Sequence, residues 1–466
     1  MSSRTSPVRF DEARPLALPL ARAVADQGFD VLLVRDVRGR FTLIVDDRDR
    51  PVDDERRGHW HTDLTGRLGP YVTGRPLVLA SELFTADSLL ASPRAVPDVL
   101  RPPGGAGRVR LLENTVVGED WARVSTPAPE ADGTVTHRTA LYGFKGGVGR
   151  TTATAVLARH LVDEGALVLV VDLDLESPGA GALLAGPDRL PRHGIVDHLV
   201  EAAVGSAEGL EIVTRADYSP LSGFGELWVA PARGRGTDGV PYGYVDKLNR
   251  VYADLPGSSF ADRLAGAVRA CEDAVALGDS GRRPDVVLLD SRAGIHDVAA
   301  VTISRLCDLA LLFGADNAQT WAGYGDLFAA WRTSGQAREI REKLRMVASM
   351  VPDSVHHSMD TYLDSFRARA YECFATLYDD VIPASDRESG PAALPEPFSP
   401  SLTDDSAPHD PLPILFEPGL IGLDPGTSPH WQDRAFVRAA YRDFLAAVTP
   451  LIMADPRLRG GGEGTR

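Results

Sequence analysis

The stretch KGGVGRTT at residues 145–152 combines glycines, two cations and two hydroxyl side chains in a pattern typical of a phosphate-binding loop. It follows an apolar run, Ala140–Phe144, typical of a short buried strand, and precedes TTATAVLARHLVDEG, in which apolar residues recur at helical spacing. The loop glycines allow a tight turn whose backbone N–H groups point inward, and the helix adds its positive N-terminus. The residues expected to surround a polyphosphate are Lys145, Gly146, Gly147, Val148, Gly149, Arg150, Thr151 and Thr152.

Two positions distinguish this loop from the ordinary phosphate-binding pattern. Arg150 stands where that pattern has a lysine, whereas Thr151 keeps the hydroxyl that reaches a bound Mg²⁺. Lys145, at the start of the loop, is one of three lysines in the chain, and arginine supplies the other positive side chains. A sequence that uses arginine almost everywhere has therefore kept a lysine at this position.

Two further motifs end in carboxylates that follow predicted strands. VVDLDLESPG, at residues 170–179, carries Asp172 and Asp174, and VVLLDSRAG, at 286–294, carries Asp290. In an open α/β sheet, ligands bind beyond the carboxyl ends of the strands, so all three motifs are expected to converge on one site. A lone strand-end aspartate pair would equally suit a helix cap or a loop, but the three motifs together favour a nucleotide site.

Each of these residue types suits a chemical role at its position. Asp290, at the tip of an apolar strand, and Asp172 are expected to hold Mg²⁺ together with the Thr151 hydroxyl. Asp174 is expected to orient or polarise an attacking water, and Gly294 to let the backbone approach a γ-phosphate.

Over about residues 139–350 the sequence resembles the MinD/ParA family of P-loop ATPases, the branch with the altered Walker A motif KGGxGKT. In that family the early lysine, here Lys145, reaches across an ATP-sandwich dimer to the phosphates of the partner subunit. The family also has a switch I aspartate, here Asp174, and a switch II DxxxG motif, here Asp290–Gly294. The resemblance implies ATP and Mg²⁺ as cofactors, a nucleotide-dependent homodimer, and Lys145 and Asp174 as catalytic residues.

Two departures from the family pattern bear on hydrolysis. The guanidinium of Arg150 pairs with phosphate oxygens but is planar and bulkier than an ammonium, which predicts retained nucleotide binding and slow hydrolysis. The switch I segment, residues 174–179, is DLESPG where plasmid-partition members have a DPQ-like pattern. Together, KGGVGR, DLE-x-PG and DSR-x-G resemble a subgroup found beside bacterial signalling or antiviral defence genes.

The rest of the chain supplies the elements that must position these motifs. Apolar runs at 166–172, 226–230, 285–290, 309–314 and 344–350 alternate with helical stretches at 259–277, 298–307, 322–334 and 357–377. This alternation predicts an α/β fold, a doubly wound, mostly parallel P-loop NTPase domain preceded by a small α/β accessory domain. The expected divisions are the accessory domain at 1–124, a linker at 125–138, the ATPase domain at 139–384, a Pro-rich loop at 385–412, and a closing strand and helix with a flexible tail at 413–466.

The accessory domain shows no catalytic constellation. Its expected elements are a helix at 15–26, strands at 31–34, 41–45, 76–80 and 109–114, and a charged turn at 46–57. His59 and His61, with Asp63 nearby, suit either a metal pair or a solvated loop, and the loop is favoured.

Composition and charge limit the classes of function. With 44% hydrophobic and 24% charged residues, the chain is typical of a globular protein, and no apolar stretch is long enough to span a bilayer. A net charge of −16 argues against a general nucleic-acid face. Three widely spaced cysteines and an N-terminus without an apolar signal core predict a cytoplasmic protein with reduced thiols. The glycine-rich C-terminal tail predicts no membrane anchor.

The leading prediction is an ATPase that acts as a molecular switch, dimerises on Mg-ATP and controls a protein partner. The N-terminal domain and the insertion at 187–283 are expected to pass the nucleotide state to that partner. The alternative is a hydrolysis-poor nucleotide-binding scaffold in which Arg150 locks a bound nucleotide. Nitrogenase iron protein and arsenical-pump ATPases have cysteines near the switches, and bacterial tyrosine kinases have a C-terminal tyrosine cluster, so all three are disfavoured. An ATP-using amide or biotin-pathway ligase stays open.

Overall fold

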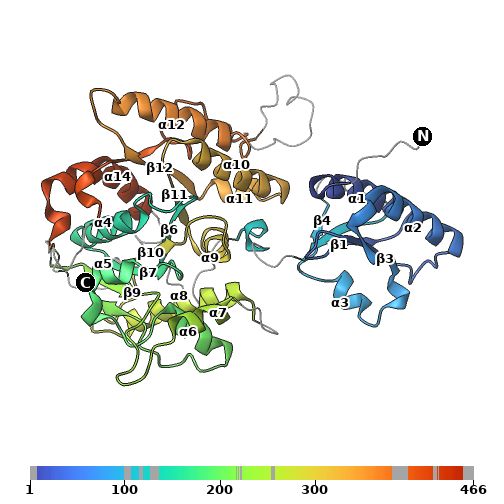
Figure 1. Cartoon of the computed structure of the whole chain (residues 1–466), viewed down its shortest axis with the longest axis horizontal. Helices are drawn as coiled ribbons and strands as arrows, with labels where there is room; N and C mark the ends of the chain where they lie inside the picture. Colours follow the sequence, from blue (N-terminus) through green and yellow to red (C-terminus); the bar gives the residue numbers. More distant parts are fainter. Residues whose placement is uncertain are drawn as a thin grey trace, which may run out of the picture. The chain divides into compact units, whose positions relative to one another are not determined.

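The computed structural model describes residues 8–98, 106–114, 119–125, 136–216, 218, 220, 223–252, 258–379, 397–422, 428 and 430–454. The chain folds as two compact units, Met1–Glu119 and Asp120–Arg466. Each unit contains one sheet with helices packed against it (Figure 1).

The smaller unit has a five-stranded mixed sheet with the order β3–β2–β1–β5–β4. Its strands are β1 (Val31–Arg35), β2 (Phe41–Val45), β3 (Val72–Leu79), β4 (Val96–Pro97) and β5 (Val109–Glu113). β1 pairs antiparallel with β2 and parallel with β5, and β2 pairs parallel with β3. Its helices are α1 (Phe10–Ala25), α2 (Asp54–Leu68) and α3 (Ala86–Leu90), with 3-10 turns η1 (Gly69–Tyr71) and η2 (Ala80–Glu82).

Both faces of this smaller sheet are covered, but unequally. α1 and α2 bury the larger core on one face, where the rings of Phe29 and Trp60 meet edge to face with centroids 5.5 Å apart. The opposite face holds a smaller cluster around Leu32, Ile44 and Leu112. Successive strand residues therefore alternate between two cores, as expected for a sheet buried on both faces.

The prediction of a charged turn and a solvated loop over residues 46–63 is wrong beyond Asp53, because the rest of this segment forms α2. The Asp53 carboxylate caps the helix by accepting a hydrogen bond from the Arg56 backbone N–H. His59 and His61 lie two residues apart on α2 and project from different sides of it, so they do not form a metal pair. Among the described residues, no cluster of three or more His, Cys, Asp or Glu side chains could hold a metal ion.

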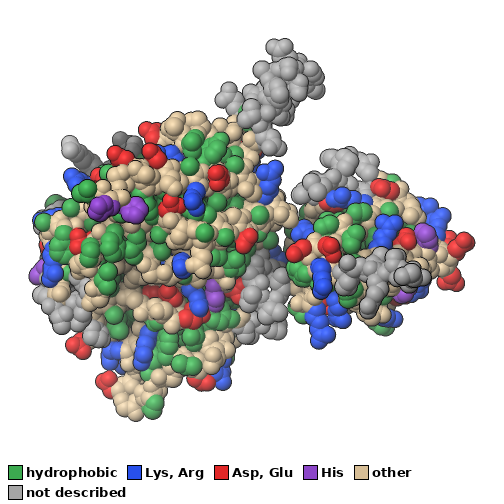
Figure 2. All heavy atoms as spheres, turned by 45° about the horizontal axis from the view of Figure 1, so that its top comes forward, with side chains coloured by type: hydrophobic (Ala, Val, Ile, Leu, Met, Phe, Trp, Pro, Cys, Tyr) green, Lys and Arg blue, Asp and Glu red, His purple; other side chains and the backbone are tan. Residues whose placement is uncertain are grey.

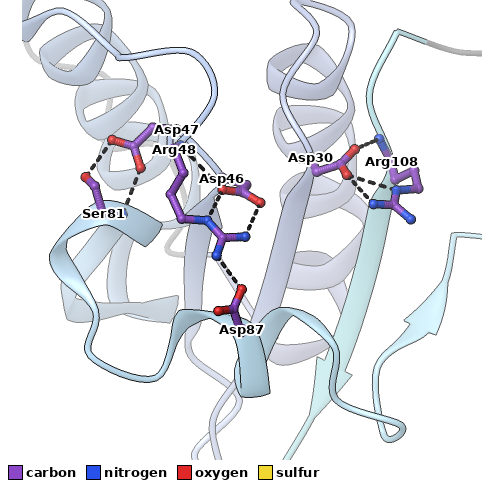
Figure 3. A network of polar contacts seen from close by, with 7 residues as sticks. All are labelled: Asp30, Asp46, Asp47, Arg48, Ser81, Asp87 and Arg108. Atoms are coloured by element: carbon purple, nitrogen blue, oxygen red, sulfur yellow. Dashed lines mark hydrogen bonds and ion pairs between the residues drawn. The ribbon is translucent and has the colours of Figure 1, made fainter.

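Acidic side chains at the ends of strands β1 and β2 of the smaller sheet form ion pairs with arginines (Figure 3). The Arg48 guanidinium donates two hydrogen bonds of 2.8 Å to the Asp46 carboxylate and also pairs with Asp87 of α3. Asp30, before β1, accepts hydrogen bonds of 2.9 and 2.6 Å from the Arg108 guanidinium. The cluster therefore has a structural role, because it joins neighbouring strand ends to each other and to α3.

The larger unit is built on an eight-stranded sheet with the order β13–β12–β11–β6–β10–β7–β9–β8. Its strands are β6 (His137–Gly143), β7 (Leu167–Leu173), β8 (Thr214–Arg215), β9 (Glu226–Ala230), β10 (Val286–Ser291), β11 (Leu309–Gly314), β12 (Leu344–Val351) and β13 (Leu412–Leu415). Every neighbouring pair is parallel except β8 with β9. The predicted fold class, a doubly wound and mostly parallel α/β sheet, is confirmed.

Helices cover both faces of the larger sheet (Figure 1). They are α4 (Arg150–Asp163), α5 (Ala180–Leu184), α6 (Ile195–Ala203), α7 (Tyr244–Val251), α8 (Phe260–Ala276), α9 (Asp297–Val301), α10 (Ala318–Thr333), α11 (Ala337–Arg341), α12 (Met359–Phe374) and α14 (Ala435–Met453), with a π-helical turn at Thr302–Leu306. Leu288 of β10 packs in the core that contains α4 and α14, whereas Leu289 packs in the core that contains α6, α8, α10 and α12. The strands are thus buried on both faces, which explains their nearly continuous apolar sequences.

Two boundaries differ from those predicted. β6 begins at His137, inside the stretch predicted as a linker, because its first residues pair with β10. Trp121, predicted within the accessory domain, packs in the core of the larger unit, where its ring centroid lies 6.1 Å from that of Tyr142. Residues 126–135 of the predicted linker and 385–396 of the predicted Pro-rich loop lie outside the described residues.

The surface carries a mixture of charges. On the face shown in Figure 2, basic and acidic side chains are interspersed over the larger unit. Within the described part of the chain, no helix combines the length and the apolar character needed to cross a membrane.

A buried ion pair holds β6 to α8 and allows a test of the packing. The Arg138 guanidinium donates hydrogen bonds of 2.7 and 2.8 Å to the carboxylate of Glu272, which is 0% exposed. Among the described residues, Arg138→Ala leaves that buried carboxylate with Arg283, whose Nη1 lies 3.8 Å from Oε2 of Glu272, as its remaining cation. We therefore expect Arg138→Ala to lower the free energy of unfolding by about 3 kcal/mol in urea denaturation.

The matched control replaces both partners. Arg138→Met with Glu272→Met removes the two charges together while keeping similar volume, so it should recover most of the stability lost in Arg138→Ala. A double variant as unstable as Arg138→Ala would show that volume, not the buried charge, decides the effect.

Candidate nucleotide-binding site

The glycine loop joins β6 to α4 at the carboxyl edge of the larger sheet. Gly147 and Gly149 have φ angles of 78° and 79°, in the left-handed region that favours glycine. A Cβ atom added at either position would meet no atom within 4 Å, so the loop faces open space. No described residue accepts a hydrogen bond from the backbone N–H groups of residues 146–149. The loop therefore presents unpaired N–H donors beside a helix N-terminus, which is the arrangement that binds anions.

The side chains of the loop differ in their surroundings. Lys145 is exposed, and no described residue forms a hydrogen bond or ion pair with its ammonium. Val148 is buried in the core that contains α4 and so anchors the loop. Thr151 and Thr152 lie half-buried in the first turn of α4.

The sheet brings two of the predicted metal ligands together. β10 lies between β6 and β7, and its pairing with β7 sets Asp290 directly beside Asp172. Leu288 and Val170, two residues earlier on the same strands, pack in the core with α4. Because side chains alternate along a strand, both carboxylates lie on the α4 face of the sheet. They are 1% and 0% exposed, respectively, so the two acids share one buried position.

Asp172 is bonded to the backbone of the switch I segment. Its Oδ2 accepts hydrogen bonds of 3.0 Å from the N–H groups of Gly179 and Ala180, and its Oδ1 accepts one of 3.2 Å from the Asp174 N–H. These bonds fold switch I back over the end of β7. A Cβ atom at Gly179 would lie 3.3 Å from Cγ2 of Thr151, so switch I closely approaches the glycine loop.

Asp290 lacks comparable backbone partners: neither of its carboxylate oxygens accepts a hydrogen bond of normal geometry from a described residue, and the donors near it are the Thr151 and Thr154 hydroxyls. Burial raises the pKa of Asp290, although the Arg150 charge and the nearby Thr151 and Thr154 hydroxyls oppose the shift. Burial and the charge of Asp290 also raise the pKa of Asp172. A buried carboxylate without backbone donors, beside a second carboxylate and a threonine hydroxyl, fits a hard divalent cation such as Mg²⁺.

Arg150 is buried, and its guanidinium lies between switch I and the end of β10. Its Nη1 donates to the carbonyl oxygen of Ser291, and its Nη2 lies 3.6 Å from Oδ2 of Asp174. Burial raises the pKa of Asp174, and the Arg150 charge opposes this shift. The side chain that replaces the usual lysine is thus paired with the aspartate predicted to orient water.

Gly294 lies against the start of the glycine loop. Its N–H donates a hydrogen bond of 3.2 Å to the carbonyl oxygen of Gly143, and its own carbonyl accepts one of 3.2 Å from the Tyr142 hydroxyl. The structure therefore gathers at one sheet edge all the residues that the sequence singled out, namely Lys145–Thr152, Asp172, Asp174, Asp290 and Gly294.

Four further residues connect the two switch segments and α7 and were not singled out from the sequence. Glu176 of switch I forms an ion pair with Arg292 of switch II, and its Oε1 lies 3.5 Å from Nε2 of His296 and accepts a hydrogen bond from the Tyr252 hydroxyl. Glu176 lies within the motif DLESPG and Arg292 within DSRAG. Because the two motifs were predicted to meet, their opposite charges could have indicated this ion pair from the sequence. No sequence signal pointed to Tyr252.

Residues 139–382, more than half of the chain, match the family model of the CobQ/CobB/MinD/ParA nucleotide binding domain. The chain belongs to this family. The match contains the glycine loop and both switch segments, so CobQ/CobB/MinD/ParA membership confirms the predicted family and identifies a nucleotide-binding domain. No curated protein sequence matches the chain.

Three solved structures are similar to this CobQ/CobB/MinD/ParA chain at low sequence identity. Cobyrinic acid a,c-diamide synthase from Mycobacterium smegmatis with bound ADP and magnesium is 19% identical over 68% of this chain and 95% of its own, with a TM-score of 0.37. The septum site-determining protein MinD from Pyrococcus horikoshii OT3, complexed with Mg-ADP, is 16% identical over 69% and 99%, with a TM-score of 0.38. pNOB8 ParA bound to nonspecific DNA is 15% identical over 70% and 100%, with a TM-score of 0.42.

The buried carboxylate pair is expected to lower the stability of the nucleotide-free protein. Because burial raises the pKa of Asp290 above 3.8, the folded protein holds this proton to a higher pH than the unfolded chain does. The free energy of unfolding therefore falls as the pH rises above that value. Asp290→Asn removes this effect and should raise the free energy of unfolding by about 1–3 kcal/mol at pH 8.

Chemical denaturation at about pH 5 and pH 8 measures this difference, with Asp279→Asn, at an exposed turn, as the control. The gain for Asp290→Asn should be larger at the higher pH, whereas the control should change little at either. An equal gain at both pH values would show that ionisation is not its cause.

Proposed function

We propose that the protein is an ATP-binding molecular switch that dimerises on Mg-ATP and hydrolyses ATP slowly. The observation that carries the proposal is the meeting, at one sheet edge, of a glycine loop with unpaired N–H donors and two buried carboxylates. Membership of a nucleotide-binding family supports it. The choice of ATP follows from the resemblance of the motifs to the MinD/ParA branch.

The residues around the loop divide the binding between phosphate and metal. Residues 145–152 hold the phosphates through their N–H groups and the N-terminus of α4. Thr151, Asp290 and Asp172 hold Mg²⁺, and the unpartnered oxygens of Asp290 support this assignment. When bound, the ion neutralises negative charge on the phosphate oxygens. Gly294, whose N–H donates to the Gly143 carbonyl oxygen, would bring switch II backbone close to the γ-phosphate, as the family resemblance implies.

Asp174 and Arg150 control the hydrolytic step in this proposal. Asp174 orients the attacking water, but without nucleotide its carboxylate is paired with Arg150 at 3.6 Å. Phosphate oxygens compete for the same guanidinium, so nucleotide binding releases Asp174. Arg150 also donates to Ser291, and its planar group does not move between partners as a lysine ammonium does. These contacts favour slow turnover.

A second copy of the chain completes the site. The exposed Lys145 supports this step, since no described residue of its own subunit holds the ammonium. Its action in trans follows from the family resemblance. The dimer then controls a protein partner. The combination of motifs suggests bacterial signalling or antiviral defence as the setting. The identity of the neighbouring genes would test this setting.

A second candidate function is a nucleotide-binding scaffold without useful hydrolysis. The Arg150 guanidinium favours the scaffold, because it is buried and held both by a hydrogen bond to Ser291 and by an ion pair with Asp174. A side chain fixed in this way can lock a nucleotide in place. The two candidates agree on the ligand and differ in turnover.

The first test measures ATP binding, turnover and oligomeric state on one preparation. Mg-ATP should convert the protein to a dimer in light scattering, and replacing Mg²⁺ by EDTA should weaken ATP binding at least about tenfold in calorimetry. Measurable phosphate release supports the switch. Nucleotide retained through purification without turnover supports the scaffold, and failure to bind ATP at all contradicts both.

Lys145→Ala tests the trans role of the loop lysine. We expect this variant to bind ATP but to lose the Mg-ATP-dependent dimer, because the Lys145 ammonium would contact the phosphates bound by the partner subunit. Arg67→Ala, which removes one exposed positive charge from α2, is the control and should dimerise normally. A Lys145→Ala protein that still dimerises on ATP would exclude a role of Lys145 in dimerisation.

Arg150→Lys tests whether the guanidinium slows turnover. A lysine ammonium cannot hold Ser291 and Asp174 in the same planar arrangement, so Asp174 should be released more readily. We expect turnover to rise about tenfold, equivalent to about 1.4 kcal/mol in the barrier, in a steady-state phosphate-release assay. Unchanged turnover with unchanged ATP affinity would exclude Arg150 as the cause of slow hydrolysis.

A further inference from the structure

The helix α7 is attached to switch I at both of its ends. At its first residue, the Tyr244 hydroxyl donates a hydrogen bond of 2.6 Å to the carbonyl oxygen of Leu175. Just after its last residue, the Tyr252 hydroxyl donates to Oε1 of Glu176. Two consecutive residues of switch I are therefore held by two tyrosines, one at each end of α7.

These two bonds are continuous with the phosphate-binding loop. Arg150, the first residue of α4, pairs with Asp174, which directly precedes Leu175 in switch I. Glu176, the next residue, pairs with Arg292 of switch II, so it connects Tyr252 to both switch segments. A displacement of Asp174 by nucleotide therefore acts on the two residues that α7 holds.

Further contacts attach α7 to α8, where the Arg263 guanidinium donates a hydrogen bond of 2.8 Å to the Val251 carbonyl oxygen, and to α6, while one side of α7 stays exposed. Lys247 pairs with Asp197 of α6, a carboxylate that is 2% exposed and also accepts a hydrogen bond of 2.5 Å from the Tyr242 hydroxyl. Val245, on the outer side of α7, is 69% exposed. The helix thus spans from the switch segments to the surface of the protein.

We propose that α7 carries the conformation of switch I to the protein surface through the Tyr244 and Tyr252 hydroxyls. The proposal rests on the nucleotide switch described above. Within the insertion at 187–283, it assigns the transmission of the nucleotide state to one helix, α7. Switch I cannot move with nucleotide while both bonds persist unless α7 moves with it. If the bonds break instead, α7 loses two of its anchors and its backbone amides become less protected.

Hydrogen–deuterium exchange of the full chain tests this coupling, with and without the non-hydrolysable ATP analogue AMP-PNP and Mg²⁺. In the native protein, the analogue should protect the glycine loop and change the exchange rate of α7 amides by at least about fivefold, the lower end of measured coupling between sites. In the double variant Tyr244→Phe with Tyr252→Phe, the loop should remain protected while the change in α7 is lost. The rings are kept, so packing is little disturbed.

Tyr371→Phe is the matched control, because the Tyr371 hydroxyl of α12 has no hydrogen-bond partner among the described residues. This variant should behave as the native protein does. A protected loop with unchanged α7 exchange in the native protein would overturn the coupling while leaving nucleotide binding intact. A double variant whose α7 still responds would overturn the tyrosine route. An unprotected loop in the native protein would overturn the nucleotide switch and this inference with it.

Discussion

The parallel pairing of β10 with both β6 and β7 is the constraint on which the rest of the site depends. It places the end of a strand that carries Asp290 between the strand that leads into the glycine loop and the strand that carries Asp172. A shift of one residue would turn Asp290 toward the opposite core, among apolar side chains. Because both faces of the sheet are buried, this register is strongly specified, and the position of the site follows from the packing of the whole domain.

The same pairing forces two carboxyl groups into one buried position, which is unfavourable in the absence of a ligand. Asp172 accepts hydrogen bonds from three backbone N–H groups, whereas no backbone N–H of the described residues donates to Asp290, and burial raises the pKa of both. Groups of this kind persist where binding requires them, and the surrounding apolar core supplies the stability that they remove. The uncompensated acid is therefore the residue that points most directly to a cation.

Several separate contacts converge on switch I. The backbone of this segment is bonded to Asp172, its first aspartate is paired with Arg150, and Glu176 joins Arg292 to Tyr252. The replacement of the usual lysine by Arg150 thus affects more than phosphate binding. A guanidinium has enough donors to hold Ser291 and Asp174 together, and this links the loop, both switch segments and α7 into one network.

The sequence determined the parts that depend on local pattern. Nearly continuous apolar runs such as 166–172 and 285–290 predicted the buried strands, and glycine and aspartate spacing predicted which residues meet at the sheet edge. It did not predict α2, because that segment is mostly polar and its helix is held by three buried apolar side chains, Trp60, Leu64 and Leu68, that pack against the sheet of the smaller unit. Only the tertiary structure decided that Arg150 pairs with Asp174 and that Glu176 joins Arg292 and Tyr252. Such contacts arise between side chains of segments far apart in sequence, whose proximity is set by packing and not by spacing along the chain.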